Sequence, residues 1–133
     1  MDYTICVAEL GGIDVFYSDI PETLSMAIPG AICLDWSLWW DGSEKNTRCA
    51  HELGHNKTGA FYTRNDPPCI RRRMENRANK WAIEHAVPKA DMEAAIECGC
   101  TETWDLAERF NVTEGFIKKA IWYYYNGNLA APA

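Results

Sequence analysis

The stretch CAHELGHNKT, residues 49–58, places His51 and His55, two of only three histidines in the chain, around Glu52. Residues four positions apart on an α-helix project in nearly the same direction, so two imidazole nitrogens here can reach one ion. Glu52 then points aside from the ion but toward a water molecule bound to it. This pattern predicts a zinc hydrolase site, with two nitrogen ligands and a carboxylate that accepts the water's proton. The alternative is an accidental match on a solvated helix face.

A catalytic zinc site usually has three protein ligands and one open position, so a third ligand must come from elsewhere in the chain. Glu75 is the best candidate, because it follows His55 by twenty residues on the next predicted helix, which leaves enough chain to turn and return antiparallel. Glu75 also adjoins the apolar stripe of that helix, and a carboxylate that faces inward needs a partner such as a cation. Two alternatives remain: Glu75 pairs on the surface with one of the arginines 71–73, or the third ligand is His85, Asp66 or a cysteine.

Asn79 lies one helical turn after Glu75 and therefore on the same face of the predicted helix. An amide oxygen there could accept a hydrogen bond from the non-ligating N–H of an imidazole, and such a bond fixes the orientation of a metal ligand. We therefore predict that Asn79 holds one of the histidine ligands in place.

The composition is that of a soluble globular protein, with 133 residues, 47% of them apolar and 24% charged, and favours one domain over residues 1–133. The net charge of −6 does not favour a nucleic-acid partner, although a local basic patch is compatible with it. The first residues lack the features of an export signal, and no apolar stretch is long enough to cross a membrane, so we expect a cytoplasmic protein. The six cysteines are then expected to be reduced.

The hydrophobic pattern predicts strands first and helices afterwards. Strands are expected over residues 13–21 and 30–38, and helices over residues 44–57, from the prolines at 67 and 68 to about 86, and over 89–98, 102–110 and 113–125. Ser43 and Thr113 are the expected N-caps, and Gly59 is the expected stop of the first helix. Residues 3–10 have weak helical character, and residues 126–133 are expected to be a frayed tail.

The segments RCAHELGHNKTGAF (48–61) and MENRANKWAIEHAVP (74–88) resemble the ImmA/IrrE family of zinc metallopeptidases, in which an AHELGH-type helix is followed by an ExxAN-like helix and a short apolar-Pro segment. The two predicted strands are also similar to those of the family, so the resemblance covers about residues 1–90. It implies an α+β fold: a small gluzincin-like core with a short β-sheet, the HExxH helix and the Glu-bearing helix, with C-terminal helices over about 89–125. It also implies that Zn2+ is bound by His51, His55 and Glu75, with Glu52 as the catalytic base.

Members of this family found on phages and mobile elements cleave a partner helix-turn-helix repressor. The resemblance therefore implies a site-specific endopeptidase whose protein substrate is such a repressor. Asn79 stands where many relatives of the wider class have Asp, and this should weaken the orientation of the imidazole without abolishing it. Tyr62, Arg64 and His85 are candidates to stabilise the oxyanion.

The predicted strand just before the HExxH helix could pair with an extended substrate and hold it over the metal. The substrate-binding residues would then be Ala31, Ile32, Cys33, Leu34 and Asp35. The alternative is an interior strand that has no free edge.

Residues 104–124 also have the spacing of two helices packed around a short turn, with shared apolar positions at Leu106, Ala107, Phe110, Val112, Phe116 and Ile117. A DNA-binding role would place residues 114–122 in the major groove. That stretch offers Lys118 and Lys119 but no arginine, asparagine or glutamine to read bases. Direct nucleic-acid binding is therefore not expected, and a packing or protein-docking role is favoured. The alternative function is a non-catalytic module that binds a repressor or DNA through this helix pair.

Overall fold

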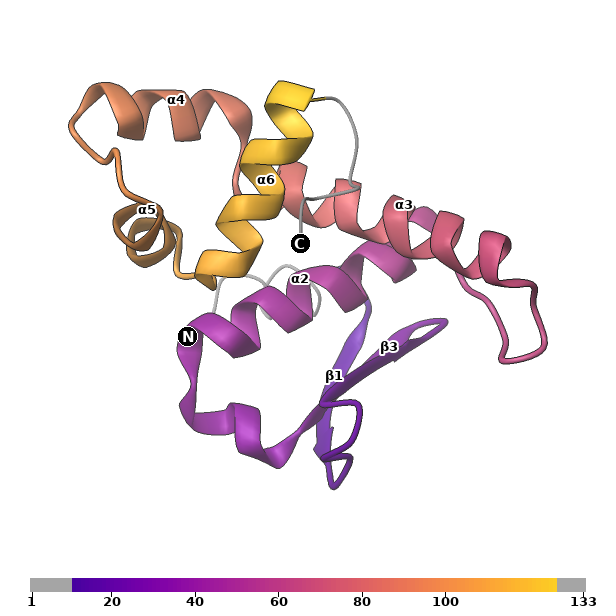
Figure 1. Ribbon diagram of the computed structural model, residues 1–133. Coiled ribbons are helices and arrows are strands. Elements are labelled where there is room, and N and C mark those ends of the chain that lie inside the picture. Colours follow the sequence, from indigo (N-terminus) through magenta and orange to yellow (C-terminus); the bar gives the residue numbers. More distant parts are fainter. Residues whose placement is uncertain (1–10, 127–133) are drawn as a thin grey trace.

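The computed structural model describes residues 11–126 of the chain and has an α+β fold, as predicted (Figure 1). The predictions for residues 3–10 and for the tail after residue 126 lie outside the described residues. The described part begins with three strands and a 3-10 helix: β1 (Asp14–Ser18), β2 (Ser25–Ile28), β3 (Ala31–Asp35) and η1 (Trp36–Trp40). Its α-helices are α2 (Gly42–Thr58), α3 (Pro68–Ala86), α4 (Lys89–Glu97), α5 (Thr103–Phe110) and α6 (Glu114–Asn126).

The three strands form one sheet in the order β1-β3-β2, in which β3 pairs parallel with β1 and antiparallel with β2. β3 is therefore the central strand, and its backbone groups already pair on both sides. The prediction that the residues Ala31, Ile32, Cys33, Leu34 and Asp35 hold an extended substrate is wrong for this reason. An edge strand, β2, lies next to α2 instead, and it was not predicted from the sequence.

The central strand is also shorter than predicted. It ends at Asp35 because the Asp35 carboxylate accepts a hydrogen bond from the N–H of Ser37 at 2.9 Å and so caps η1. The same carboxylate accepts a hydrogen bond from the N–H of Ile20 at 2.8 Å. Asp35 thus ties the chain after β1 to the end of β3 and turns it toward α2.

Helix α2 begins with Asp41 as its N-cap, and the prediction of Ser43 is wrong. Asp41 Oδ1 accepts the hydrogen bond from the N–H of Glu44 at 3.1 Å, which satisfies one of the free donors of the first turn. The helix ends as predicted at Gly59, whose φ of 67° is in the left-handed region that favours glycine. One face of α2 packs on the sheet in a buried core formed by Ile13, Ile32, Leu34, Leu38, Cys49 and Leu53.

Helix α3 packs along α2, and the two helices lie side by side in Figure 1. Beyond them, the end of α3 and the helices α4, α5 and α6 enclose a second core, in which Ile83, Met92, Leu106 and Ile117 are fully buried. The apolar positions predicted for the C-terminal helix pair are buried in this core, apart from Phe110, which is half-buried against it. The Thr113 hydroxyl accepts a hydrogen bond from the N–H of Phe116 at 3.2 Å, which confirms Thr113 as an N-cap.

Two further expectations concern the whole chain. The described cysteines, at positions 33, 49, 69, 98 and 100, are all free thiols, as predicted, and Cys6 lies outside the described residues. Across residues 11–126, none of the helices combines the length and the apolar character that a membrane crossing requires.

Candidate metal centre

Helices α2 and α3 bring three ligand-type side chains together: His51 and His55 from α2, and Glu75 from α3. The Nε2 atom of His51 lies 2.7 Å from Oε2 of Glu75, and the Nε2 atom of His55 lies 3.2 Å from the same oxygen. The two Nε2 atoms are 3.2 Å apart. Among residues 11–126, this is the only cluster of histidine, cysteine and carboxylate groups with a geometry that could hold a metal ion.

The second ring nitrogen of each histidine faces an oxygen atom. Nδ1 of His51 lies 2.7 Å from Oδ1 of Asn79, and Nδ1 of His55 lies 2.6 Å from the backbone oxygen of Ala60. Because both oxygens are acceptors, each Nδ1 carries a proton and donates it. A neutral imidazole with its proton on Nδ1 keeps a lone pair on Nε2. In the neutral form of each imidazole, the lone pair on Nε2 therefore faces the space next to Glu75.

Both carboxylate oxygens of Glu75 have partners. Oε1 accepts a hydrogen bond from the Tyr62 hydroxyl at 2.5 Å, while Oε2 faces the two imidazoles. Burial raises the pKa of Glu75, but its hydrogen bonds with His51, His55 and Tyr62 lower the pKa by more, to well below its usual range. Glu75 is therefore ionised at neutral pH. The hydrogen bond to this carboxylate in turn raises the pKa of Tyr62 to about 12.

A cation fits this donor set. Two imidazole lone pairs and an ionised carboxylate lie within 4.8 Å of one another, and such acceptors repel unless a positive charge lies between them. Without a metal, the charge would fall on an imidazole. Burial lowers the pKa of His55, but its hydrogen bond with Glu75 and the nearby carboxylates raise that pKa by more. Imidazole nitrogen and carboxylate oxygen are also the ligands that zinc takes in catalytic sites.

Glu52 lies outside the ligand group and inside the surrounding cleft. Its side chain is buried, and Oε2 accepts a hydrogen bond from the Ser25 hydroxyl of β2 at 2.8 Å. Glu52 and Glu75 both line a cavity of about 630 Å³, which extends to Lys119 of α6, and a cavity of about 230 Å³, which extends along β2. The two cavities therefore meet at the ligand group, and together we call them the cleft.

Other hollows and other candidate ligands lie elsewhere. A hollow of about 770 Å³ between η1 and the α5–α6 turn has no histidine or cysteine in its lining. His85 is exposed and stacks on Trp81, with the ring centroids 3.9 Å apart. The Asp66 carboxylate accepts a hydrogen bond from the N–H of Thr63 at 2.7 Å, and Cys49 is buried in the core between α2 and the sheet. Of the third ligands considered from the sequence, Glu75 is the one that joins the histidines.

Two groups that contact the site were missed by the sequence analysis. Ser25 lies on β2, which was not predicted, and no sequence signal marked it. The carbonyl of Ala60 reaches His55 because Gly59 ends α2 in a left-handed turn, and the N–H of Ala60 donates to the backbone oxygen of His55 at 3.1 Å. The glycine stop was visible in the sequence, so this second contact could have been inferred.

An HExxH helix packed against a helix that supplies a carboxylate, beside a cleft, is the arrangement of a metallopeptidase. Comparison with protein-family models agrees: the model of the IrrE N-terminal-like domain matches residues 41–121, from the N-cap of α2 into α6. The chain therefore belongs to this family, which consists of metallopeptidases of the IrrE/ImmA type, and its membership implies a protein substrate. Searches of the curated proteins and of the solved structures returned no match.

Proposed function

We propose that the protein is a zinc-dependent endopeptidase in which His51, His55 and Glu75 bind the metal ion and Glu52 is the catalytic base. The observation that carries this proposal is the convergence of two histidine Nε2 atoms and Glu75 Oε2 in a cleft that Glu52 also lines. A purely structural metal site has no use for a carboxylate beside its open position, whereas a hydrolase needs one to accept a proton.

Zinc bound at this site would polarise the scissile carbonyl and lower the pKa of a bound water from about 15.7 toward ~7. Glu52 would accept the proton of that water and then pass it to the leaving amine. The Ser25 hydroxyl, which donates to Oε2 of Glu52, orients this carboxylate and leaves its other oxygen for proton transfer. By accepting the Nδ1 protons, Asn79 and the carbonyl of Ala60 would orient the two imidazoles so that each Nε2 faces the metal.

An extended substrate is proposed to pair with β2, since β2 is an edge strand of the sheet. Three residues of β2, Ser25, Met26 and Ala27, line the smaller cavity together with His55 and Glu75. Backbone pairing with an edge strand gives affinity, and pockets for the side chains give specificity. Side chains of the substrate would enter the larger cavity, where the start of α6 forms part of the lining. This arrangement gives the C-terminal helices a role in substrate selection.

The proposed substrate is a partner helix-turn-helix repressor of a phage or mobile element, and the proposed location is the cytoplasm. This part of the proposal is supported by the family resemblance of residues 48–88. Cleavage would inactivate the repressor and release the expression of the genes that it silences.

The alternative, a non-catalytic module built on α5 and α6, has weaker support. The turn between these helices is bound to α2, because the side-chain amide of Asn46 donates to the backbone oxygen of Asn111 at 2.9 Å. The N–H of Thr113 also donates to the hydroxyl of Thr47 at 3.0 Å. These contacts support a role for α6 as a wall of the cleft.

The direct test compares the wild type with Glu52→Gln and His55→Ala. Glu52→Gln should keep bound zinc and lose peptide cleavage, because only the base is changed, whereas His55→Ala should lose both. Zinc is measured by elemental mass spectrometry on the purified protein. Cleavage is measured by co-expression with the product of the neighbouring gene, followed by mass spectrometry of the fragments.

Two results would count against the proposal in different ways. Cleavage that persists in Glu52→Gln would refute the assigned base. A neighbouring gene product that stays intact beside zinc-loaded wild-type protein, while an unrelated peptide library is cut, would refute the repressor as substrate and leave the peptidase in place.

A further inference from the structure

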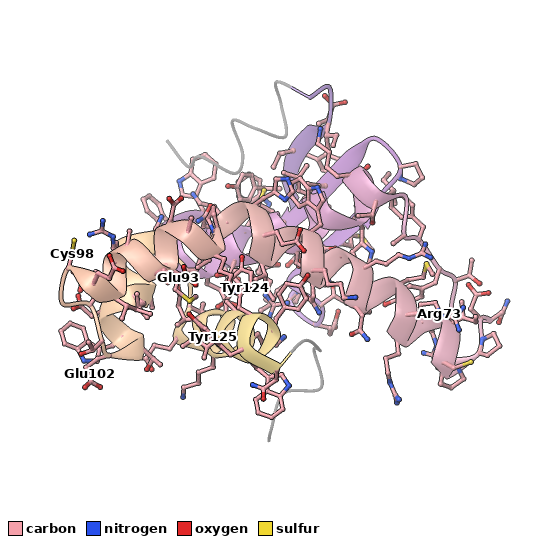
Figure 2. The ribbon with its side chains drawn as sticks, turned by 90° about the horizontal axis from the view of Figure 1, so that it is seen from above. Arg73, Glu93, Cys98, Glu102, Tyr124 and Tyr125 are labelled. Carbon is pink, nitrogen blue, oxygen red and sulfur yellow. The ribbon has the colours of Figure 1, made fainter. Side chains whose placement is uncertain are left out.

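The charges of the chain are divided between two ends of the molecule. Residues 57–80 contain seven basic and two acidic side chains, whereas residues 89–114 contain two basic and seven acidic ones. The first segment includes the loop before α3 and most of α3, and the second includes α4 and α5. In Figure 1, α4 and α5 lie on one side of the molecule, and the loop and the start of α3 lie on the opposite side. Figure 2 shows Arg73 at one end and Glu93 and Glu102 at the other. One end of the molecule is therefore strongly basic although the net charge of the chain is −6.

The basic end carries a row of exposed cations on α3, which we call the α3 stripe: Arg72, Arg73, Arg77 and Lys80. None of these four side chains forms an ion pair with another residue in the range 11–126. Together with Cys69 and Asn76 they line a hollow of about 380 Å³. Their charges are therefore not neutralised by the described part of the protein.

The α3 stripe faces away from the metal centre. At 3.6 residues per turn, the stripe residues fall on one side of the helix, and Glu75, Ala78 and Ala82 fall on the other. Ala78 and Ala82 are fully buried, and Glu75 faces the histidines of α2. A partner bound to the stripe would therefore leave the cleft open.

We propose that the α3 stripe binds the phosphate backbone of duplex DNA without reading its sequence. Residues 72 to 80 span about 12 Å of helix axis, at 1.5 Å per residue. Along the axis of a DNA duplex, one strand carries a phosphate every 3.4 Å, so about three or four phosphates of that strand lie within this length of axis. Arginine matches phosphate with two parallel hydrogen bonds, and three of the four cations of the stripe are arginines.

The same surface is less suited to two other partners. Stable protein–protein interfaces depend on buried aromatic or apolar anchors, and the lining of the hollow has no such side chain besides the small thiol of Cys69. Single-stranded nucleic acid is usually held by aromatic side chains that stack on the bases, and the stripe has none. The expectation from the sequence that DNA is not bound rested on the net charge and on residues 114–122, and it set the basic tract 71–73 aside because that tract belongs to the helix of Glu75. The stripe lies on the opposite side of that helix from Glu75.

The test measures binding of a fluorescent 20-base-pair duplex of arbitrary sequence to the full chain by anisotropy, between about 50 and 200 mM salt. If the four cations neutralise four phosphates, a plot of the logarithm of the binding constant against the logarithm of the salt concentration should have a slope of about −3 to −4. The variant Arg72→Gln/Arg73→Gln/Arg77→Gln should lose at least about tenfold in affinity at 50 mM salt, and its slope should fall to about −1. The matched control Lys89→Gln/Arg109→Gln/Lys118→Gln removes the same charge from exposed positions elsewhere and should bind as the wild type does.

Three outcomes would overturn the proposal. They are no duplex binding by the wild type at 50 mM salt, equal losses of affinity in the stripe variant and the control, or a salt dependence of wild-type binding with a slope near zero. A glutamate-rich peptide is tested in parallel. Binding of that peptide through the stripe, without duplex binding, would assign the stripe to an acidic protein and refute DNA. Thermal unfolding checks that both variants are folded, and none of these measurements depends on peptidase activity, so failure here is separate from failure of the proposed function.

Discussion

Gly54 of α2 lies directly against the backbone of Ala78 in α3. A Cβ atom on Gly54 would stand 3.0 Å from the carbonyl carbon of Ala78 and closer still to its oxygen, a separation that real side chains do not adopt. Ala78 itself lies between Glu75 and Asn79, the two α3 residues that contact the histidines. The missing side chain at position 54 therefore lets α3 come close enough to bring both groups to the histidines.

Gly54→Ala should weaken both the fold and the metal site. The added methyl group must push α3 away from α2, and overpacking of this kind costs about 1–3 kcal/mol of unfolding free energy. The same shift separates Glu75 from the imidazoles, so zinc affinity should fall by about tenfold or more. Urea unfolding and zinc titration against a chromophoric chelator measure the two effects.

Gly115→Ala is the matched control, since a Cβ at position 115 has open space around it. In a helix this change should be neutral or stabilise by up to about 1 kcal/mol. If Gly54→Ala behaved in the same way, the close approach of the two helices would not be what holds the site together.

The contact between Asn79 and His51 gives a prediction about zinc affinity. Asn79→Ala removes the acceptor of the Nδ1 proton, and the loss of such a contact typically costs about 10–100-fold in metal affinity. Asn79→Asp should bind zinc more tightly than the wild type, because a charged acceptor makes a stronger hydrogen bond. Competition with a chelator gives both dissociation constants, and Asn76→Ala, on the same helix but outside the cleft lining, should leave the affinity unchanged.

The role of Tyr62 can be determined from the effect of removing its hydroxyl. The hydroxyl donates to Oε1 of Glu75 and leaves Oε2 to face the histidines, so Tyr62→Phe should weaken zinc binding by about tenfold. With zinc at saturating concentration, turnover should recover most of the wild-type rate. An unchanged zinc affinity with turnover lower by about 100-fold or more would instead assign Tyr62 to the oxyanion.

The helices and the grouping of His51, His55 and Glu75 could be predicted from the sequence because they depend on short-range geometry. His51 and His55 share a face through helical spacing alone, and Gly59 marks the end of the helix that carries them. Glu75 required one further step, a count of the residues needed to turn and return. That step succeeds because the connection is short and the face of α3 that carries Glu75 packs along α2.

The sheet was harder to predict, because strand order depends on pairings between distant residues. Ser25 and its three neighbours on β2 form too short a run to show alternation, and without β2 the central position of β3 is invisible. The prediction of the N-cap of α2 failed for a local reason. Asp41 and Ser43 are both good caps, and only the backbone path after η1 selects Asp41. The role of Gly54 also emerges only once α3 is in place.

Tyr124 should stabilise the fold by joining α6 to the end of α3. Its hydroxyl donates to the backbone oxygen of Val87 at 2.6 Å and lies 3.3 Å from that of Ile83. Tyr124→Phe leaves the ring and removes these bonds, so the free energy of unfolding at pH 7 should fall by about 1–2 kcal/mol. Chemical unfolding followed by circular dichroism measures the difference.

The contribution of Tyr124 should also depend on pH. Burial, with the nearby charge of Glu84, raises the pKa of Tyr124 to about 12 in the folded chain, from 10 for an ordinary tyrosine. Because the folded state holds the proton more tightly, this stabilisation is complete below pH 10 and is lost as the pH rises toward 12. The difference in stability between wild type and Tyr124→Phe should therefore shrink across that interval. A difference that stayed constant from pH 8 to pH 11.5 would show that the hydroxyl keeps its proton equally well in the unfolded chain, and would contradict the assigned contacts.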